Sequence, residues 1–209
     1  MLSFRSELSV QSDPVVVRCF ALADRVGHAV FVQGDSESPI ELMRSIEGDS
    51  DQEHPPSGPM QEMVAESTSV GKPPALMGLG SAGKSHWSCS IEADGTMPAI
   101  AFDFACKSRT AGWLGSSYQL ADGWDAVLAN EQTLRLTRPN CPPVAIRVLG
   151  DGRLQWDTRQ AVISLMAGEV SPDAPAALKP QRRWRYAVGL AESLIFDSER
   201  EAEIGGPQY

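Results

Sequence analysis

Alternation of apolar and polar residues with a period of two is the feature that most constrains the fold of this chain. It is clearest in HWSCSIEA at 86–93 and in AIAFDFAC at 99–106. Successive side chains of a β-strand point to opposite faces of a sheet, whereas a helix repeats about every 3.6 residues. The pattern therefore predicts strands that bury one face and leave the other to solvent.

Turn residues between the alternating runs predict hairpins. Asp94-Gly95 separates the two runs above, and Gly150-Asp151-Gly152 separates 144–148 from 154–156. Asp-Gly and Gly-rich pairs are typical of tight turns between antiparallel strands. Another hairpin is expected from PVVVRCFAL and HAVFVQ, which flank ADRVG near the N-terminus, and further strands from QTLRLTR and RRWRYAVGL.

Few stretches of the chain fit a helix. Only TRQAVISLMAGEV and PMQEMVAES could be helical, and both also fit a strand. A parallel α/β fold needs several helices of about ten residues or more between its strands. We therefore expect an all-β fold, an antiparallel β-sandwich or squat barrel, in a single domain over residues 10–192.

The net charge of −9 is concentrated outside this body. Residues 35–66 carry nine carboxylates against one cation, whereas residues 80–192 carry 11 carboxylates and 12 cations. The stretch from 47 to 74 is rich in Pro, Ser and Gly, so we expect a mobile acidic loop there, with one ordered patch at Met60 to Val64. A short acidic tail at 193–209 is expected to be disordered.

These properties exclude some classes of partner. A near-neutral body is a poor match for nucleic acid or an anionic membrane surface. The sequence contains no run of about 18 apolar residues and no signal-peptide pattern at its N-terminus. The four cysteines, Cys19, Cys89, Cys106 and Cys141, are scattered without a C-x-x-C pair, which indicates reduced thiols and a cytoplasmic location.

The motif GLGSAGKS at 78–85 matches the phosphate-binding P-loop pattern at Gly78, Gly83, Lys84 and Ser85. A working P-loop follows a buried strand and opens a helix whose amides hold the phosphates. Here the residues after the motif alternate like a strand. Nucleotide binding is therefore an alternative hypothesis, in which Asp103 would hold the metal ion. A helix at 84–95 would support it.

Catalytic and metal sites find little support in the sequence. Ser85, His86 and Asp103 could be written as a hydrolytic triad, but neighbours on a strand face opposite ways. His86 and Cys89 have a spacing typical of metal ligands, but on a strand their side chains would point to opposite faces. The two thiols of Cys89 and Cys106 are too few for a zinc site, which needs four ligands. We expect no catalytic residues, no metal and no cofactor, and treat a hydrolase as the weakest alternative.

Aromatic residues in a turn-rich segment give the leading functional hypothesis. Trp113, Tyr118 and Trp124 lie in GWLGSSYQLADGW, outside the clear strands. Rigid aromatic side chains at the mouth of a sandwich could hold a small molecule or a partner protein. The leading function is thus a non-enzymatic β-domain that binds through loops around 112–124. The alternative for these residues is that they fill the end of the core.

A basic segment near the C-terminus, KPQRRWRY, is explained by strand alternation, with arginines outward and Trp184 and Tyr186 inward. An additional hypothesis is that Arg182, Arg183 and Arg185 contact the acidic insert or tail within the same chain.

Overall fold

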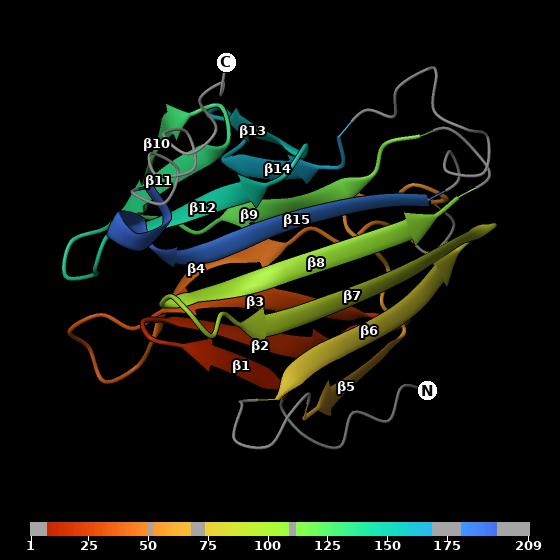
Figure 1. Ribbon diagram of the computed structural model, residues 1–209, viewed down its shortest axis with the longest axis horizontal. Coiled ribbons are helices and arrows are strands. Elements are labelled where there is room, and N and C mark those ends of the chain that lie inside the picture. The colour runs from red at the N-terminus through yellow and green to blue at the C-terminus, as the bar shows by residue number, and fades with distance from the viewer. Residues whose placement is uncertain (1–7, 50–51, 68–73, 109–111, 169–180, 196–209) are drawn as a thin grey trace, which may run out of the picture.

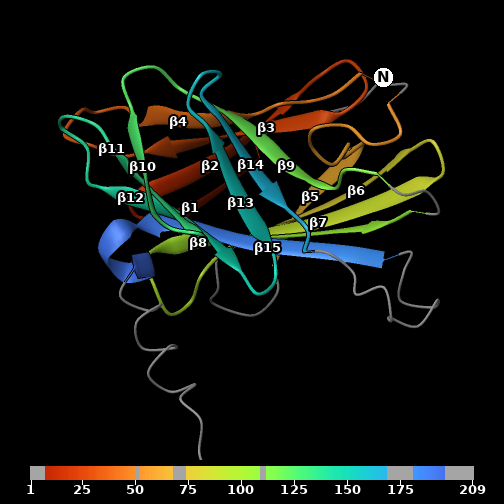
Figure 2. The same cartoon turned by 90° about the horizontal axis from the view of Figure 1, so that it is seen from above.

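The computed structural model describes residues 8–49, 52–67, 74–108, 112–168 and 181–195. These residues form two antiparallel sheets that pack face to face, as Figure 1 and Figure 2 show. Within the described ranges, the one helix is the short segment 191–195. The expected all-β fold is confirmed. It is a sandwich and not a closed barrel, because each sheet keeps two edge strands.

The first sheet has seven strands and contains the N-terminal hairpin that the sequence predicts. Val15–Ala21 pairs with Val26–Val32 in antiparallel register. The strands in spatial order are β1 (Ser9–Ser12), β2 (Val15–Ala21), β3 (Val26–Val32), β4 (Ile40–Ser45), β9 (Gly115–Leu120), β14 (Val162–Met166) and β13 (Arg153–Asp157).

The second sheet has eight strands and contains the predicted hairpin around Asp94-Gly95. The residues after the P-loop-like motif form a strand that pairs with 99–107. The strands in spatial order are β10 (Asp125–Asn130), β11 (Thr133–Thr137), β12 (Val144–Leu149), β15 (Gln181–Leu190), β8 (Ala99–Lys107), β7 (Ser85–Ala93), β6 (Ala75–Ala82) and β5 (Glu62–Glu66).

The core between the sheets follows the alternation in the sequence. On β8 and β15, the inward series contains large buried aromatic and aliphatic residues: Ile100, Phe102, Phe104, Trp184, Tyr186 and Val188. Phe102 stacks on Tyr186 with ring centroids 4.7 Å apart, and Phe104 stacks on Trp184 at 5.5 Å. Burial of these large rings removes apolar surface from water, which is the main stabilising contribution to such a fold.

A chain of polar side chains crosses this apolar core and links the two sheets. The Nε2 atom of His28 lies 2.6 Å from the hydroxyl of Tyr118, which also hydrogen-bonds the hydroxyl of Tyr186. Nearby, Trp184 Nε1 donates to Ser116 Oγ at 3.0 Å. Buried polar groups are costly unless paired, so these bonds favour one mutual position of the sheets.

The predicted hairpin at 144–156 is wrong. The two strands exist, but β12 pairs with β11 and β15 in one sheet, whereas β13 pairs with β14 in the other. The turn at 150–152 therefore carries the chain across the sandwich. Alternation and turn residues identify strands locally, but the choice of partner depends on distant segments.

The acidic segment at 47–74 is described in part, and its expected mobility stays a prediction. Its described part, 47–49 and 52–67, includes strand β5 and the buried residue Met60. Val26 N donates to Met60 O at 2.7 Å, and Ser117 N donates to Pro56 O at 2.9 Å. Composition alone misses such backbone hydrogen bonds, which attach a sequence poor in large apolar residues to neighbouring strands. The expected patch at 60–64 coincides with Met60 and β5, and residues 50–51 and 68–73 lie outside the description.

The two stretches that could have been helical, 59–67 and 158–170, contain β5 and β14. Of the predicted tail, residues 193–195 belong to the short helix, and the remainder lies outside the described residues. This helix covers a small apolar cluster on the outer face of the second sheet, formed around Ala99, Ala145 and Ala187. No helix in the described part of the chain is long and apolar enough to cross a membrane.

Candidate functional site

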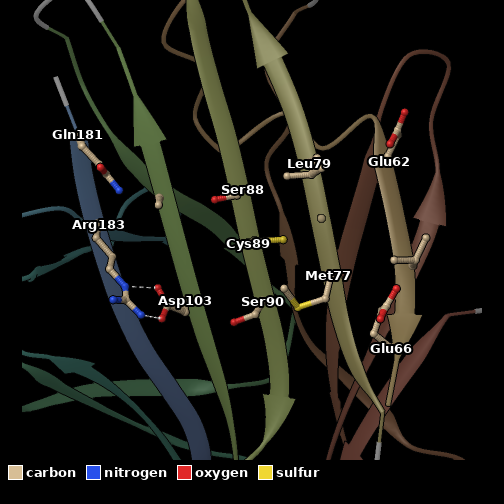
Figure 3. Close-up of a pocket in the computed structure, with 13 residues that line it drawn as sticks. Glu62, Glu66, Met77, Leu79, Ser88, Cys89, Ser90, Asp103, Gln181 and Arg183 are labelled. Carbon is tan, nitrogen blue, oxygen red and sulfur yellow. Dashed lines mark hydrogen bonds and ion pairs between the residues drawn. The ribbon is translucent and has the colours of Figure 1, made fainter. Parts of the chain in front are cut away.

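A groove of about 560 Å³ lies on the outer face of the second sheet. We call it the outer groove. Its lining comes entirely from five neighbouring strands, β5, β6, β7, β8 and β15 (Figure 3). With strands about 4.8 Å apart, five strands span roughly 19 Å. The groove is therefore a broad surface of one sheet.

Side-chain size along the alternating strands explains why the sheet surface is hollow there. On β7 and β8, three of the four outward residues that line the groove are small, namely Ser88, Ser90 and Ala105, and the fourth is Asp103. The large residues of the same strands point into the core. Longer side chains stand on either side, from β5 and β6 and from β15.

One side of the groove exposes apolar side chains. Val64 is 51% exposed, Met77 is 42% exposed and Leu79 is 59% exposed. Val64 and Met77 are directly opposite each other across β5 and β6, and Leu79 is opposite Glu62. Single exposed apolar residues are ordinary, but adjacent ones on a sheet surface are typical of interaction sites.

Carboxylates flank this apolar strip. Glu62 and Glu66 project from β5 on the same face as Val64 (Figure 3). Neither carboxylate has a hydrogen bond or an ion pair with any side chain that the structure describes. This side of the groove therefore presents two negative charges that nothing within the described residues neutralises.

The opposite side of the groove is neutralised by its own contacts. Arg183 donates to both carboxylate oxygens of Asp103, with an Nε–Oδ1 distance of 2.7 Å, and Arg185 Nε lies 3.6 Å from Oδ2. The hydrogen bond that Arg183 donates to Asp103 raises the pKa of Arg183. Within the described residues, Arg183 and Arg185 pair with Asp103 and not with the acidic insert that the hypothesis named. Residues 196–209 of the acidic tail, the other partner it named, lie outside the described part of the chain. Arg182 instead donates to the carbonyl of Gly168.

The P-loop-like motif forms strand β6, a turn at 83–84 and the first residue of β7. Residues 85–93 are a strand, so the helix that would hold phosphates is absent at this position. The hydroxyl of Ser85 is buried and bonds Ser108 Oγ at 2.8 Å. Asp103, the supposed metal-holding residue, pairs with Arg183. The geometry thus gives the nucleotide alternative no support.

The glycines of the motif have packing roles. A Cβ atom on Gly78 would lie 2.6 Å from Cys89 Sγ, and one on Gly80 would lie 1.7 Å from the carbonyl oxygen of Pro59. Gly83 has φ +56°, a conformation that side chains disfavour and that a tight turn requires here. The motif therefore reflects close approach of neighbouring segments and one turn.

The three aromatic residues of the leading hypothesis do not form an exposed platform. Tyr118 lies in strand β9, so its expected place in a loop is wrong, and its side chain is fully buried. Trp124 is buried too, with Nε1 donating to Glu41 O at 2.9 Å. Trp113 is half-buried. Stacking of a ligand on Tyr118 would require breaking its hydrogen bonds to His28 and Tyr186.

The residues considered for hydrolysis and metal binding are not brought together. Ser85 points into the core and His86 is exposed on the other face. Burial raises the pKa of Cys89 to about 12 and of Cys106 to about 11, so both are thiols at neutral pH and poor nucleophiles. Within the described ranges, no group of three or more His, Cys, Asp or Glu is placed to hold a metal.

Comparisons with protein-family models, with curated proteins and with solved structures find no match to this chain. The sequence reasoning did not single out Glu62, Met77 or Leu79. Their outward position follows from the alternation of β5 and β6, but only the sheet order places them beside β7, β8 and β15.

Proposed function

We propose that this protein is a non-enzymatic binding module whose outer groove holds an extended, basic and apolar peptide segment of a partner protein. The observation that carries this proposal is the exposed apolar strip of Val64, Met77 and Leu79 beside two carboxylates, Glu62 and Glu66, that have no partner among the described residues. This keeps the expected binding role but moves the site from the segment 112–124 to the sheet surface.

Charge favours a cationic ligand. The groove lining contains three carboxylates and one guanidinium, and Asp103 is already paired with Arg183. Glu62 and Glu66 remain to attract lysine or arginine side chains. Such attraction would mainly raise the association rate and the specificity, whereas burial of the apolar strip would supply most of the affinity.

The shape of the groove favours a peptide over a small molecule. Sites for small ligands are enclosed and bury most of the ligand surface. The outer groove is formed by a single sheet face and extends across five strands. An extended segment of about six residues, at about 3.3 Å per residue, would span a surface of this width.

Selection from a random-peptide phage library, followed by fluorescence polarisation with the selected peptides, tests the proposal. We expect enrichment of sequences that combine lysine or arginine with aliphatic residues. The double variant Met77→Ala/Leu79→Ala should weaken binding by about tenfold or more, because it removes about 1.4 kcal/mol or more of apolar contact.

Two variants away from the groove serve as matched controls. One lies on β10, at the far edge of the same sheet, and the other lies in the turn that follows β10. Val127→Ala removes an apolar residue that is 66% exposed on β10, away from the groove, and should leave binding unchanged. Glu62→Lys/Glu66→Lys should weaken binding and reverse its salt dependence, whereas Glu131→Lys should do neither. Enrichment of acidic peptides, or equal losses with Val127→Ala, would overturn the proposal.

A further inference from the structure

Four sulfur-bearing side chains meet at one place in the core, beneath the outer groove. They are Cys19 on β2, Met60 before β5, Met63 on β5 and Cys89 on β7. Cys19, Met60 and Cys89 are buried, and Met63 packs against the same core. Cys19 Sγ lies 3.1 Å from Met63 Sδ, to which it donates a hydrogen bond. We call these four residues the sulfur cluster.

The side chains of Met60, Met63 and Cys89 converge beside Gly78, which has no side chain of its own. A Cβ atom placed on Gly78 would lie 2.6 Å from Cys89 Sγ, 3.2 Å from Met60 Sδ and 3.1 Å from the terminal methyl carbon of Met63. The absence of a side chain at Gly78 leaves this space to the sulfur groups. Met63, whose sulfur accepts the hydrogen bond of Cys19, joins the thiol of Cys19 to this group.

The outer groove reaches the sulfur cluster. Both Gly78 and Cys89 belong to the groove lining, although Cys89 is on the inner side of β7. Figure 3 shows the sulfur of Cys89 directed toward β6, the strand that carries Gly78. The paired backbones of β6 and β7 lie between the groove and Cys89 Sγ, so an ion would enter through local opening of this strand pair.

The chemistry of the cluster selects a soft metal ion. Thiolate and thioether sulfur ligands favour Cu(I), whereas carboxylate and carbonyl oxygens favour magnesium, calcium or manganese. Zinc prefers thiolate and imidazole ligands, and two of the four sulfurs here are thioethers. The nearest imidazole in register, that of His28 opposite Cys19, already bonds Tyr118 through Nε2.

We infer that the sulfur cluster is a binding site for one Cu(I) ion, held by the Cys89 thiolate and the thioethers of Met60 and Met63, while the Cys19 thiol remains beside the site as hydrogen-bond donor to Met63. Binding breaks the S–H bond of Cys89, forms a copper–sulfur bond and releases one proton to solvent, with no change in oxidation state. One thiolate and one Cu(I) ion give a neutral site, which is the charge that a buried position favours. Cys19 stays protonated and keeps its hydrogen bond to Met63.

Anaerobic titration with Cu(I), in competition with the chelator bathocuproine disulfonate, tests the inference. We expect one copper per chain, about one proton released and an X-ray absorption spectrum with sulfur neighbours alone. Cys89→Ser should weaken binding by at least about tenfold. Met60→Leu/Met63→Leu preserves the apolar volume of the core and should also weaken binding, while circular dichroism confirms that the variant is folded.

Two other cysteines provide controls. Cys106→Ser replaces a buried thiol on β8, and Cys141→Ser replaces the half-buried thiol before β12. Both variants should bind Cu(I) like the unmodified chain. The inference is overturned if Met60→Leu/Met63→Leu binds copper unchanged, if Cys141→Ser abolishes binding, or if nitrogen or oxygen neighbours dominate the spectrum. Glu62→Lys/Glu66→Lys should retain Cu(I) affinity even where it weakens peptide binding, so the two proposals can fail separately.

Discussion

At the scale of single residues, the most unusual side chain is a buried histidine in a β-sandwich core. His28 is packed near Phe102, Phe104 and Tyr118, with its ring centroid 5.9 Å from that of Phe102. Burial lowers the pKa of His28 to about 4, so the ring is neutral at pH 7. A neutral ring can remain in the apolar core and bond Tyr118, whereas the charged form would have to be desolvated.

The lowered pKa of His28 predicts a loss of stability in mild acid. Below pH 6.5 the unfolded chain takes up a proton at His28 that the folded chain takes up only near pH 4. The contribution of His28 to the free energy of unfolding is therefore fully present above pH 6.5. It is lost as the pH falls to about 4, and the total loss is about 3 kcal/mol. Urea unfolding at several pH values measures this change in the free energy of unfolding.

The variant His28→Gln separates this effect from the titration of carboxyl groups. Glu47, whose pKa is raised mainly by burial, contributes with the opposite sign because its folded form holds a proton at higher pH than its unfolded form. Replacement of His28 should flatten the decline between pH 6.5 and pH 4 and leave the contribution of Glu47 in place. An unchanged decline would contradict the prediction.

Gly80 provides a second prediction at this scale. A methyl group there would collide with the backbone carbonyl of Pro59, which cannot move without displacing the segment before β5. We expect Gly80→Ala to lower the free energy of unfolding by about 1–3 kcal/mol. Gly95→Ala, where a Cβ atom meets nothing within 4 Å, should change it by less than about 0.5 kcal/mol. Equal effects of the two substitutions in thermal melts would show that Gly80 has no packing role.

At the scale of elements, β15 joins the interior and the surface of the second sheet. Its inward residues Trp184 and Tyr186 bond side chains of the first sheet, whereas its outward residue Arg183 pairs with Asp103 on β8. The inward contacts link β15 to the first sheet, and the outward contact links it to β8. They differ in solvent exposure, since the side chain of Arg183 is 62% exposed and Ser116, the partner of Trp184, is buried.

This difference predicts unequal costs for two substitutions. Asp103→Asn should lower the free energy of unfolding by less than about 1 kcal/mol, with a smaller effect at high salt, because the guanidinium of Arg183 is largely exposed to solvent. Ser116→Ala should cost about 1–3 kcal/mol, because it leaves the indole N–H of Trp184 buried without its partner. Chemical denaturation at low and high salt measures both. A larger cost for Asp103→Asn would mean that the surface pair determines the position of β15.

At the scale of the whole molecule, one continuous apolar core joins the two sheets. Residues from the first and the second sheet belong to the same buried cluster, including Val17, Leu42, Phe102 and Ile146. The polar chain from His28 to Tyr186 crosses the same interface. Neither sheet could keep its inner face away from water without the other.

A shared core predicts one cooperative unfolding transition. Two measurements should give the same midpoint of unfolding in urea. Far-ultraviolet circular dichroism reports the strands. Tryptophan fluorescence reports the five tryptophans, among them the buried Trp87, Trp124 and Trp184. The variant Tyr186→Phe should shift both midpoints together, because it removes a hydroxyl between the sheets. Two separated midpoints would indicate that the sheets unfold independently.

Much of the fold could be predicted from local alternation. The pairs β2–β3 and β7–β8 are neighbours in sequence and in space, so a turn between two amphipathic runs was enough to predict them. The pairing of β12 with β15 was missed because their partnership joins residues some forty positions apart. Local pattern carries no information about such a choice, which depends on how all the strands share one core.

The sequence by itself determined that this chain forms antiparallel strands and which side of each strand is apolar, because a period of two depends only on the geometry of the extended backbone. Only the tertiary structure decided what the remaining residues do. Strand order placed Glu62, Met77 and Leu79 on one groove, and core packing brought Cys19 and Cys89 beside two methionines. Contacts between distant segments depend on the packing of the whole chain, so the groove and the sulfur cluster had no signature in any single stretch.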